Sequence, residues 1–275
     1  MNVLSLFDGM SCGQIALSKS GIKIDNYFAS EIDKYAIKVT MKNYPNTKQI
    51  GNVTEVKSID FPKIDLLIGG SPCQGFSFAG KQLNFDDPRS KLFFEFVRLK
   101  NELKPKYFLL ENVKMKKEYQ NIISEFLGVE PIEIKSSKFV PHNRKRLYWT
   151  NISIIEPQQQ DYNISDFIED GGFATQCKLE LNPRRVFFKK ADIFNTLTAV
   201  YYKGISGSSR PAVSIRESYL DEDRAAHRML TPNECEALQT VPKDYTKAVS
   251  KTQRYKMLGN GWTVDVISHI FSFLN

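Results

Sequence analysis

The sequence lacks the features that mark disulfide-rich, metal-binding and membrane-spanning chains. Its 275 residues include only four cysteines, which are far apart and have no paired metal-ligand spacing: Cys12, Cys73, Cys177 and Cys235. This usage favours a reducing cytoplasm over a disulfide scaffold. Residues 1–15 lack the charged start and long apolar core of a signal peptide, and no apolar run is long enough to span a membrane. We therefore expect a soluble, cytoplasmic protein without a metal site, and separately we expect a monomer.

Acidic charge is in the minority, and internal repeats and low-complexity tracts are absent. Lys and Arg number 38 against 31 Asp and Glu, a formal net charge of +7, which favours a polyanionic partner, although a basic protein with a solvated surface has the same balance. Residues 178–216 hold eight Lys or Arg against two acids, interleaved with aromatic residues and a Gly/Ser-rich loop. This composition fits a nucleic-acid surface, because phosphates need cations, and it also fits a merely soluble small domain.

Short apolar strands alternate with helical patterns through residue 151, which predicts an α/β fold with a mostly parallel sheet. The strand at 3–7 leads through a glycine-containing turn into a helix, a unit that holds a nucleotide-like cofactor at the helix N-terminus. The strand at 26–30 ends at Glu31, whose carboxylate suits ribose hydroxyls. The turn is not G-x-G-x-x-G, so a nicotinamide enzyme is a weak match. Thr231 and Pro232 predict a helix start, and residues 226–275 complete the sheet domain.

Two further predicted strands end at residues whose side chains could take part in catalysis. The strand at 65–68 opens through two glycines to Pro72 and Cys73, where a thiol is aimed at a cleft; a lone cysteine is more often a small buried hydrophobe. The strand at 107–110 ends at Glu111, at the edge where parallel sheets bind ligands, although a capping or ion-paired Glu has the same pattern. Alternation predicts that Arg144 and Arg146 share one face of the next strand, and a solvated basic edge has the same pattern.

Taken in order, these stretches resemble the motifs of the DNA (cytosine-5) methyltransferases. The resemblance covers essentially the whole chain outside 152–225, which corresponds to an irregular target-recognition domain; residues 1–151 and 226–275 correspond to the catalytic and cofactor-binding domain. Thr196-Leu197 resembles the short signature within the recognition region. The motifs are Phe7-Asp8-Gly9 with Glu31, Ser71-Pro72-Cys73-Gln74, residues 85–94, Glu111-Asn112-Val113, Arg144-Lys145-Arg146, residues 228–234 and Gly259-Asn260-Gly261.

The resemblance implies transfer of a methyl group from S-adenosylmethionine to carbon 5 of a cytosine flipped out of duplex DNA, with S-adenosylhomocysteine as product. It assigns Cys73 as the nucleophile that attacks carbon 6 and Glu111 as the carboxylate that bonds ring nitrogen 3 and the exocyclic amine. Arg146 corresponds to the arginine that holds the base carbonyl and that carboxylate, with Arg144 beside it.

The resemblance also assigns binding residues, with some departures from the family pattern. Ser11, Cys12 and Gly13 stand where many members are richer in glycine, and Asn52 stands where many carry Asp. Trp262 resembles the vertebrate de novo branch, whereas the Cys73 loop resembles bacterial enzymes. The expected cofactor residues are Phe7, Asp8, Gly9, Ser11, Cys12, Glu31, Ile32, Asn52, Val53, Pro72, Leu92, Asn260 and Trp262. The expected DNA-binding residues are Gln74, Ser77, Arg89, Arg184, Arg185, Thr196, Lys203 and Arg210.

Three other functions compete with DNA methylation. A branch of the same family modifies transfer RNA with the same catalytic residues, so Cys73 and Glu111 do not discriminate; Gln74 to Ser77 and the basic band at 178–216 favour DNA. A catalytically inactive homologue that binds DNA would not need to retain Cys73, Glu111 and both arginines. An amino-methyltransferase needs a Pro-Pro-aromatic motif that the chain lacks. A cognate restriction endonuclease is a further candidate partner, and the recognised DNA sequence is not readable from loop residues.

Overall fold

The computed structural model describes residues 1–72, 88–181, 184–205, 210–215 and 226–274, without the side chains of 88–91 and 176–189. The chain forms two compact units. The first comprises Met1–Ile134, Lys145–Glu156 and Ile267–Asn275, and the second comprises Lys135–Arg144 and Pro157–Val266. By packing, residues 226–266 therefore belong to the same unit as most of the segment expected to recognise DNA, and so do Lys135–Arg144 from the expected catalytic domain. The functional boundary at 226 stays a prediction.

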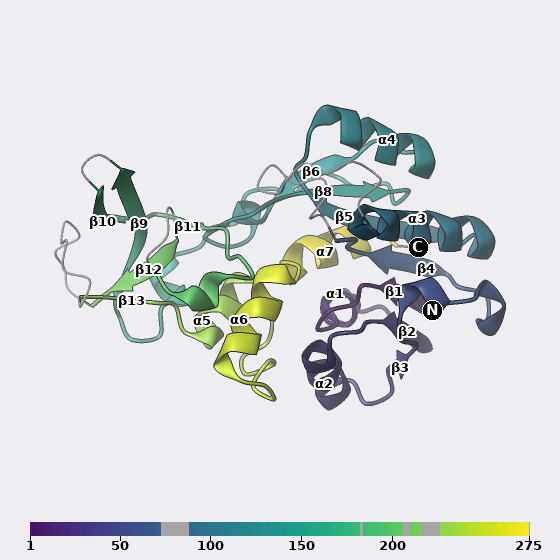
Figure 1. Cartoon of the computed structure of the whole chain (residues 1–275), viewed down its shortest axis with the longest axis horizontal. Coiled ribbons are helices and arrows are strands. Elements are labelled where there is room, and N and C mark those ends of the chain that lie inside the picture. Colours follow the sequence, from purple (N-terminus) through teal and green to yellow (C-terminus); the bar gives the residue numbers. More distant parts are fainter. Residues whose placement is uncertain (73–87, 182–183, 206–209, 216–225, 275) are drawn as a thin grey trace. The chain divides into compact units, whose positions relative to one another are not determined.

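The first unit is built on a seven-stranded sheet of order β3-β2-β1-β4-β5-β8-β6 (Figure 1). Neighbouring strands from β3 to β5 pair in parallel, and β8 pairs antiparallel with β5. The predicted mostly parallel sheet is confirmed. The strands are β1 (Asn2–Leu6), β2 (Asn26–Ser30), β3 (Lys48–Gln49), β4 (Leu66–Gly69), β5 (Tyr107–Val113), β6 (Ile132–Lys135) and β8 (Lys145–Thr150).

Apolar strands and amphipathic helices form one continuous core in this unit. Helix α3 contributes Phe96 and Leu99, which are fully buried. Glycine at position 69 allows close packing of β4 on its neighbours, because a Cβ there would lie 3.1 Å from the Leu6 carbonyl oxygen and 3.1 Å from the Phe96 ring. The helices are α1 (Cys12–Lys19), α2 (Lys34–Asn43), α3 (Pro88–Leu103), α4 (Lys117–Leu127) and α7 (Val264–Phe271), of which the part from Ile267 belongs to this unit; short 3-10 turns are η1 (Val53–Glu55) and η2 (Ser58–Asp60).

The second unit contains more regular structure than the sequence pattern predicted. A four-stranded antiparallel sheet of order β10-β9-β12-β13 takes three of its strands from the segment expected to be irregular. Residues 173–181 do alternate polar and less polar residues, but charged Lys178 and Glu180 made a strand there difficult to predict. The strands are β7 (His142–Asn143), β9 (Phe173–Leu181), β10 (Arg184–Lys190), β11 (Phe194–Asn195), β12 (Pro211–Ser214) and β13 (His227–Arg228).

Two helices complete the second unit: α5 (Pro232–Leu238) and α6 (Lys251–Asn260), with the 3-10 turns η3 (Ser136–Lys138), η4 (Ile164–Phe167) and η5 (Tyr201–Lys203). The predicted start of α5 is confirmed, because Thr231 and Glu234 form a reciprocal capping box with Pro232 in the first turn. Tyr201 fixes η5 against α6 through an edge contact with the Tyr255 ring at 5.4 Å. No helix in the described part of the chain has the length and apolar character needed to cross a bilayer.

Candidate active site

The turn after β1 has an unusual backbone. Phe7, Gly9 and Ser11 all adopt positive φ, at 57°, 59° and 61°. For the two residues with side chains this conformation is strained, and it persists only where surrounding contacts fix it. The amide of Asp8 donates to the Ser30 carbonyl at 3.1 Å, and the amide of Gly9 donates to Glu31 at 2.7 Å. The turn is thus tied to the end of β2.

Asp8 lies at the centre of a cluster of hydroxyl groups beneath this turn. Its carboxyl accepts hydrogen bonds from the Tyr27 hydroxyl at 2.7 Å and from the Ser11 hydroxyl. Burial raises the pKa of Asp8 from its ordinary value of 3.8 to about 6, because desolvation outweighs the hydroxyl groups of Ser11, Ser5 and Tyr27; the charge of Glu31 adds to the rise. Asp8 therefore changes its charge near neutral pH.

Glu31 is held rigidly where β2 ends. One carboxylate oxygen accepts from the Gly9 amide, and the other accepts from the amides of Ile32 and Asp33 at 2.7 and 2.8 Å. The Ile32 side chain next to it is 76% exposed. Asn52 follows on the neighbouring strand end, and its side chain accepts from the Thr54 amide at 3.2 Å. A fixed carboxylate, an exposed apolar side chain and an amide are therefore available at adjoining strand ends.

Other expected cofactor residues have mainly structural surroundings. Val53 and Cys12 are buried, and Leu92 packs against the hydrophobic core of the first unit. Cys235, which no prediction used, is also buried, and desolvation raises the pKa of its thiol well above the ordinary value, so it stays protonated. Neither buried cysteine has the character of a nucleophile.

The segment that leads to Cys73 is fixed by a neighbouring strand. The Asn112 amide in β5 donates to the Ser71 carbonyl at 3.3 Å and to the Ser71 hydroxyl at 3.2 Å, and both residues are buried. Sequence reasoning did not assign Asn112 a role, although it lies within the Glu-Asn-Val motif. Pro72 follows at the last described position, whereas Cys73, Gln74 and Ser77 lie outside the described residues.

Glu111 and Arg146 form an ion pair on the first unit. The Arg146 Nε atom lies 2.9 Å from a Glu111 carboxylate oxygen, and both side chains are mostly buried. In the antiparallel pairing of β5 and β8, Arg146 lies opposite Val113, two residues from Glu111. The two side chains are therefore diagonal neighbours on the same face of the sheet. The structure brings these two predicted catalytic residues together.

Arg144 has different partners, all in the second unit. It precedes the first residue of β8, so the alternation that paired it with Arg146 does not extend to it. Its guanidinium is buried and donates to three backbone carbonyls, those of Leu197, Gly259 and Gly261. Asn260 and Trp262, both expected at the cofactor, flank the last of these acceptors.

The residues expected on DNA are only partly described. The Thr196 hydroxyl donates to the Asn143 carbonyl, the Arg210 guanidinium donates to the Gly204 carbonyl, and Lys203 lies in η5. The side chains of Arg89, Arg184 and Arg185 lie outside the described part of the structure, although their backbones belong to α3 and β10.

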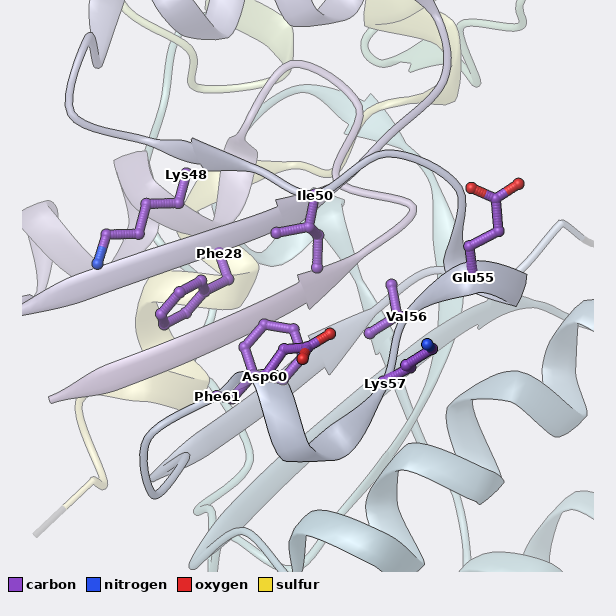
Figure 2. A pocket seen from close by; sticks show the side chains of 8 residues that line it. All are labelled: Phe28, Lys48, Ile50, Glu55, Val56, Lys57, Asp60 and Phe61. Carbon is purple, nitrogen blue, oxygen red and sulfur yellow. The ribbon is translucent and has the colours of Figure 1, made fainter.

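One pocket of about 280 Å³ lies between β2, β3 and the segment that includes η1 and η2 (Figure 2). Phe28 and Phe61 meet there edge to face at 5.0 Å, and the Lys48 ammonium lies 4.9 Å from the centre of the Phe28 ring. None of the predicted site residues lines it. Among the described residues, no cluster of three metal-ligating side chains occurs.

The geometry at Glu111 agrees with the family suggested by the motifs, and comparison with known proteins decides the family. The model of the C-5 cytosine-specific DNA methylase family matches residues 1–168 and 172–274. The chain belongs to this family. The predicted family, fold class and class of enzyme are confirmed.

Named relatives and solved structures support the same assignment. The type II methyltransferase M1.ScrFI of Lactococcus lactis subsp. cremoris is 32% identical over 98% of this chain and 76% of its own length. The orphan methyltransferase M.SPRI of Bacillus phage SPR is 30% identical over 97% of this chain, which spans 61% of that relative. The structure of the Entamoeba histolytica methyltransferase EhMeth matches with a TM-score of 0.80 over 100% of this chain and 99% of that one, at 20% identity, and shows the same fold.

Proposed function

We propose that this protein methylates carbon 5 of cytosine in duplex DNA, with Cys73 as nucleophile and Glu111 and Arg146 as the groups that hold the base. The observation that carries the proposal is the Glu111–Arg146 ion pair at 2.9 Å, directly next to the Asn112–Ser71 hydrogen bonds that precede Cys73. A carboxylate and a guanidinium at fixed positions match the amine, ring nitrogen and carbonyl edge of cytosine.

The residues at the strand ends fit S-adenosylmethionine. A side chain built at Gly9 would meet no atom within 4 Å, so a ligand has room to approach the turn backbone. The fixed Glu31 carboxylate suits the ribose hydroxyls, and the exposed Ile32 side chain suits an adenine face. Phe7, Asp8, Ser11, Asn52, Asn260 and Trp262 complete the proposed set. When bound, this cofactor supplies an electrophilic methyl group.

The chain's own residues then carry out the covalent chemistry on cytosine. The Cys73 thiolate forms a bond to carbon 6, and the electron pair of the 5,6 double bond becomes available at carbon 5. Glu111 accepts a hydrogen bond from the exocyclic amine and shares a proton with ring nitrogen 3, and Arg146 donates to the carbonyl oxygen, so the charge that develops on the ring is stabilised. After carbon 5 has gained the methyl group, a water molecule accepts its proton and the bond to Cys73 breaks, which restores the aromatic ring and the thiolate.

The test is transfer of labelled methyl groups to duplex DNA and, in parallel, to total transfer RNA, followed by nucleoside analysis. We expect label in DNA as 5-methylcytosine, and none from Cys73→Ser, which should still bind S-adenosylhomocysteine with nearly unchanged affinity. Label in RNA alone would keep the chemistry and overturn the substrate. Absence of label in both, with the cofactor product still bound, would favour a regulatory DNA-binding protein. Equal loss of transfer and cofactor binding in Cys73→Ser would remove the nucleophile assignment.

We propose that DNA binds the basic band at 178–216, which includes Thr196, Lys203 and Arg210. The relatives named above include both a type II and an orphan enzyme, so an accompanying endonuclease stays a prediction. The test for such an endonuclease is whether an extract of cells that carry the genes next to this one cleaves unmethylated DNA.

A further inference from the structure

Arg144 joins two segments that have different parts in the proposed function. Arg144 is 3% exposed. The Nη1 atom donates to the Leu197 carbonyl at 3.3 Å and to the Gly259 carbonyl at 3.1 Å, and Nη2 donates to the Gly261 carbonyl at 2.8 Å. A planar guanidinium with fixed donors can span several carbonyls at once, which a lysine ammonium cannot do in the same geometry. One cation thus binds the backbone of both segments.

The first segment, Thr196 and Leu197, is also held by the residues just before Arg144. The Leu197 amide donates to the His142 Nε2 atom at 3.0 Å, and the Thr196 hydroxyl donates to the Asn143 carbonyl. Strand β11, which ends at Asn195, pairs in parallel with β7 over the same stretch. A displacement of Thr196 therefore acts directly on residues 142–144.

The second segment, 259–261, is in backbone contact with the first. A Cβ added at Gly259 would lie 2.3 Å from the Thr198 carbonyl carbon, so only glycine allows this approach. The buried Gln239 amide donates to the Leu258 carbonyl at 2.7 Å and fixes the turn from its other side. Asn260 and Trp262 project from this turn, so its position determines theirs.

We propose that Arg144 is a positioning residue that couples DNA binding at Thr196–Leu197 to cofactor binding at Asn260 and Trp262. This inference rests on the proposed function, because that function assigns DNA to one segment and the cofactor to the other. DNA that orders Thr196 and Leu197 fixes the guanidinium, and the guanidinium fixes the turn at 259–261. The reverse effect of cofactor on DNA affinity follows from thermodynamic linkage and must have the same size.

The experiment measures the dissociation constant of S-adenosylhomocysteine with and without saturating duplex DNA of the kind that the wild-type protein methylates. We expect the wild-type protein to bind the cofactor product at least about fivefold more tightly with DNA, the lower end of typical coupling. In Arg144→Lys this ratio should fall towards one, because the ammonium keeps the charge but does not span three carbonyls. The same ratio, obtained from DNA affinity with and without cofactor product, should fall equally.

Arg254→Lys is the matched control. Arg254 is a second mostly buried arginine of the same unit, which binds Glu236 at 2.9 Å and Asn233 at 2.7 Å. Its substitution should lower the thermal stability and leave the coupling ratio unchanged. Should Arg144→Lys fail to fold, His142→Phe removes the acceptor for the Leu197 amide and should reduce the ratio in the same direction.

The outcomes separate the two proposals. Three results would overturn the coupling role: a wild-type affinity ratio of one, an unchanged ratio in Arg144→Lys or in its substitute His142→Phe, or an equal loss of the ratio in Arg254→Lys. If the wild-type protein still transfers methyl groups, the proposed function stays intact in each of these cases. Absence of methyl transfer by the wild-type protein would instead overturn the proposed function and the coupling role with it.

Discussion

Asn112, one residue after Glu111, holds Ser71, two residues before Cys73, by two hydrogen bonds from a single amide. The carboxylate and the thiol proposed for catalysis thus come from strand ends that are linked side chain to backbone. Asn112 has no acidic or nucleophilic group of its own. Asn112 contributes by fixing the positions of Glu111 and of the segment that leads to Cys73.

Asn112→Ala should slow methyl transfer much more than it weakens cofactor binding. We expect a fall in kcat of roughly 10- to 100-fold, because a small misplacement of a reacting group has that effect. Removal of the two hydrogen bonds should lower the free energy of unfolding by about 1–3 kcal/mol. Single-turnover methylation and urea denaturation measure the two quantities. The control is Asn151→Ala, since Asn151 makes comparable bonds to Phe108 and Lys106 on the same pair of strands; a similar fall in kcat there would contradict the placement role.

The Glu111–Arg146 pair should be required for chemistry to a greater extent than for folding. Glu111→Gln keeps the shape but removes the charge, and we expect kcat to fall by roughly 100-fold or more with little change in stability. The kcat of Arg146→Lys should fall by a similar amount, because a point charge does not replace the guanidinium. Steady-state methylation checks both variants. Lys114→Ala breaks the more exposed pair with Glu133 at 2.8 Å and should change neither kcat nor stability by a measurable amount.

Neutralising Arg184 and Arg185 should weaken DNA binding and flatten its dependence on salt. For each phosphate that the variant no longer neutralises, the slope of log K against log salt should decrease by about 0.9. Binding isotherms between low and physiological salt give this slope. The double variant Lys243→Gln, Lys247→Gln removes two largely exposed charges of the same unit and serves as the control. An unchanged slope in the arginine variant would count against the basic band as the DNA surface.

The parallel half of the fold was predictable because each strand is a short apolar run that ends at a polar residue. Asp8 and Glu31 follow two such strands, β1 and β2, as predicted, whereas the strand expected to end at Glu111 continues to Val113, because Glu111, Asn112 and Val113 still pair with β8. The β9–β10 hairpin was not predicted, because its many lysine and arginine residues obscure the alternation of the less polar residues. The role of Arg144 could not be predicted from the sequence either. Its three acceptors are carbonyls at positions 197, 259 and 261, and backbone acceptors leave no signature in a sequence.

Asp8 gives a prediction about pH. Because its pKa rises from 3.8 to about 6 on folding, the folded protein retains this proton over a range in which the unfolded chain has released it. The stabilising effect is therefore complete below about pH 4 and is lost as the pH rises through 6, with a slope of at most roughly 1.4 kcal/mol per pH unit. Urea denaturation from pH 4 to 7 should show this decline in the wild-type protein relative to Asp8→Asn, which cannot titrate there. Tyr27→Phe removes a hydroxyl that lowers the pKa of folded Asp8, so the decline should begin at the same pH and continue to a higher pH. Parallel stability curves for the wild-type protein and Asp8→Asn would mean that the carboxyl is ionised throughout, and the strained turn would then enclose a charge rather than a proton.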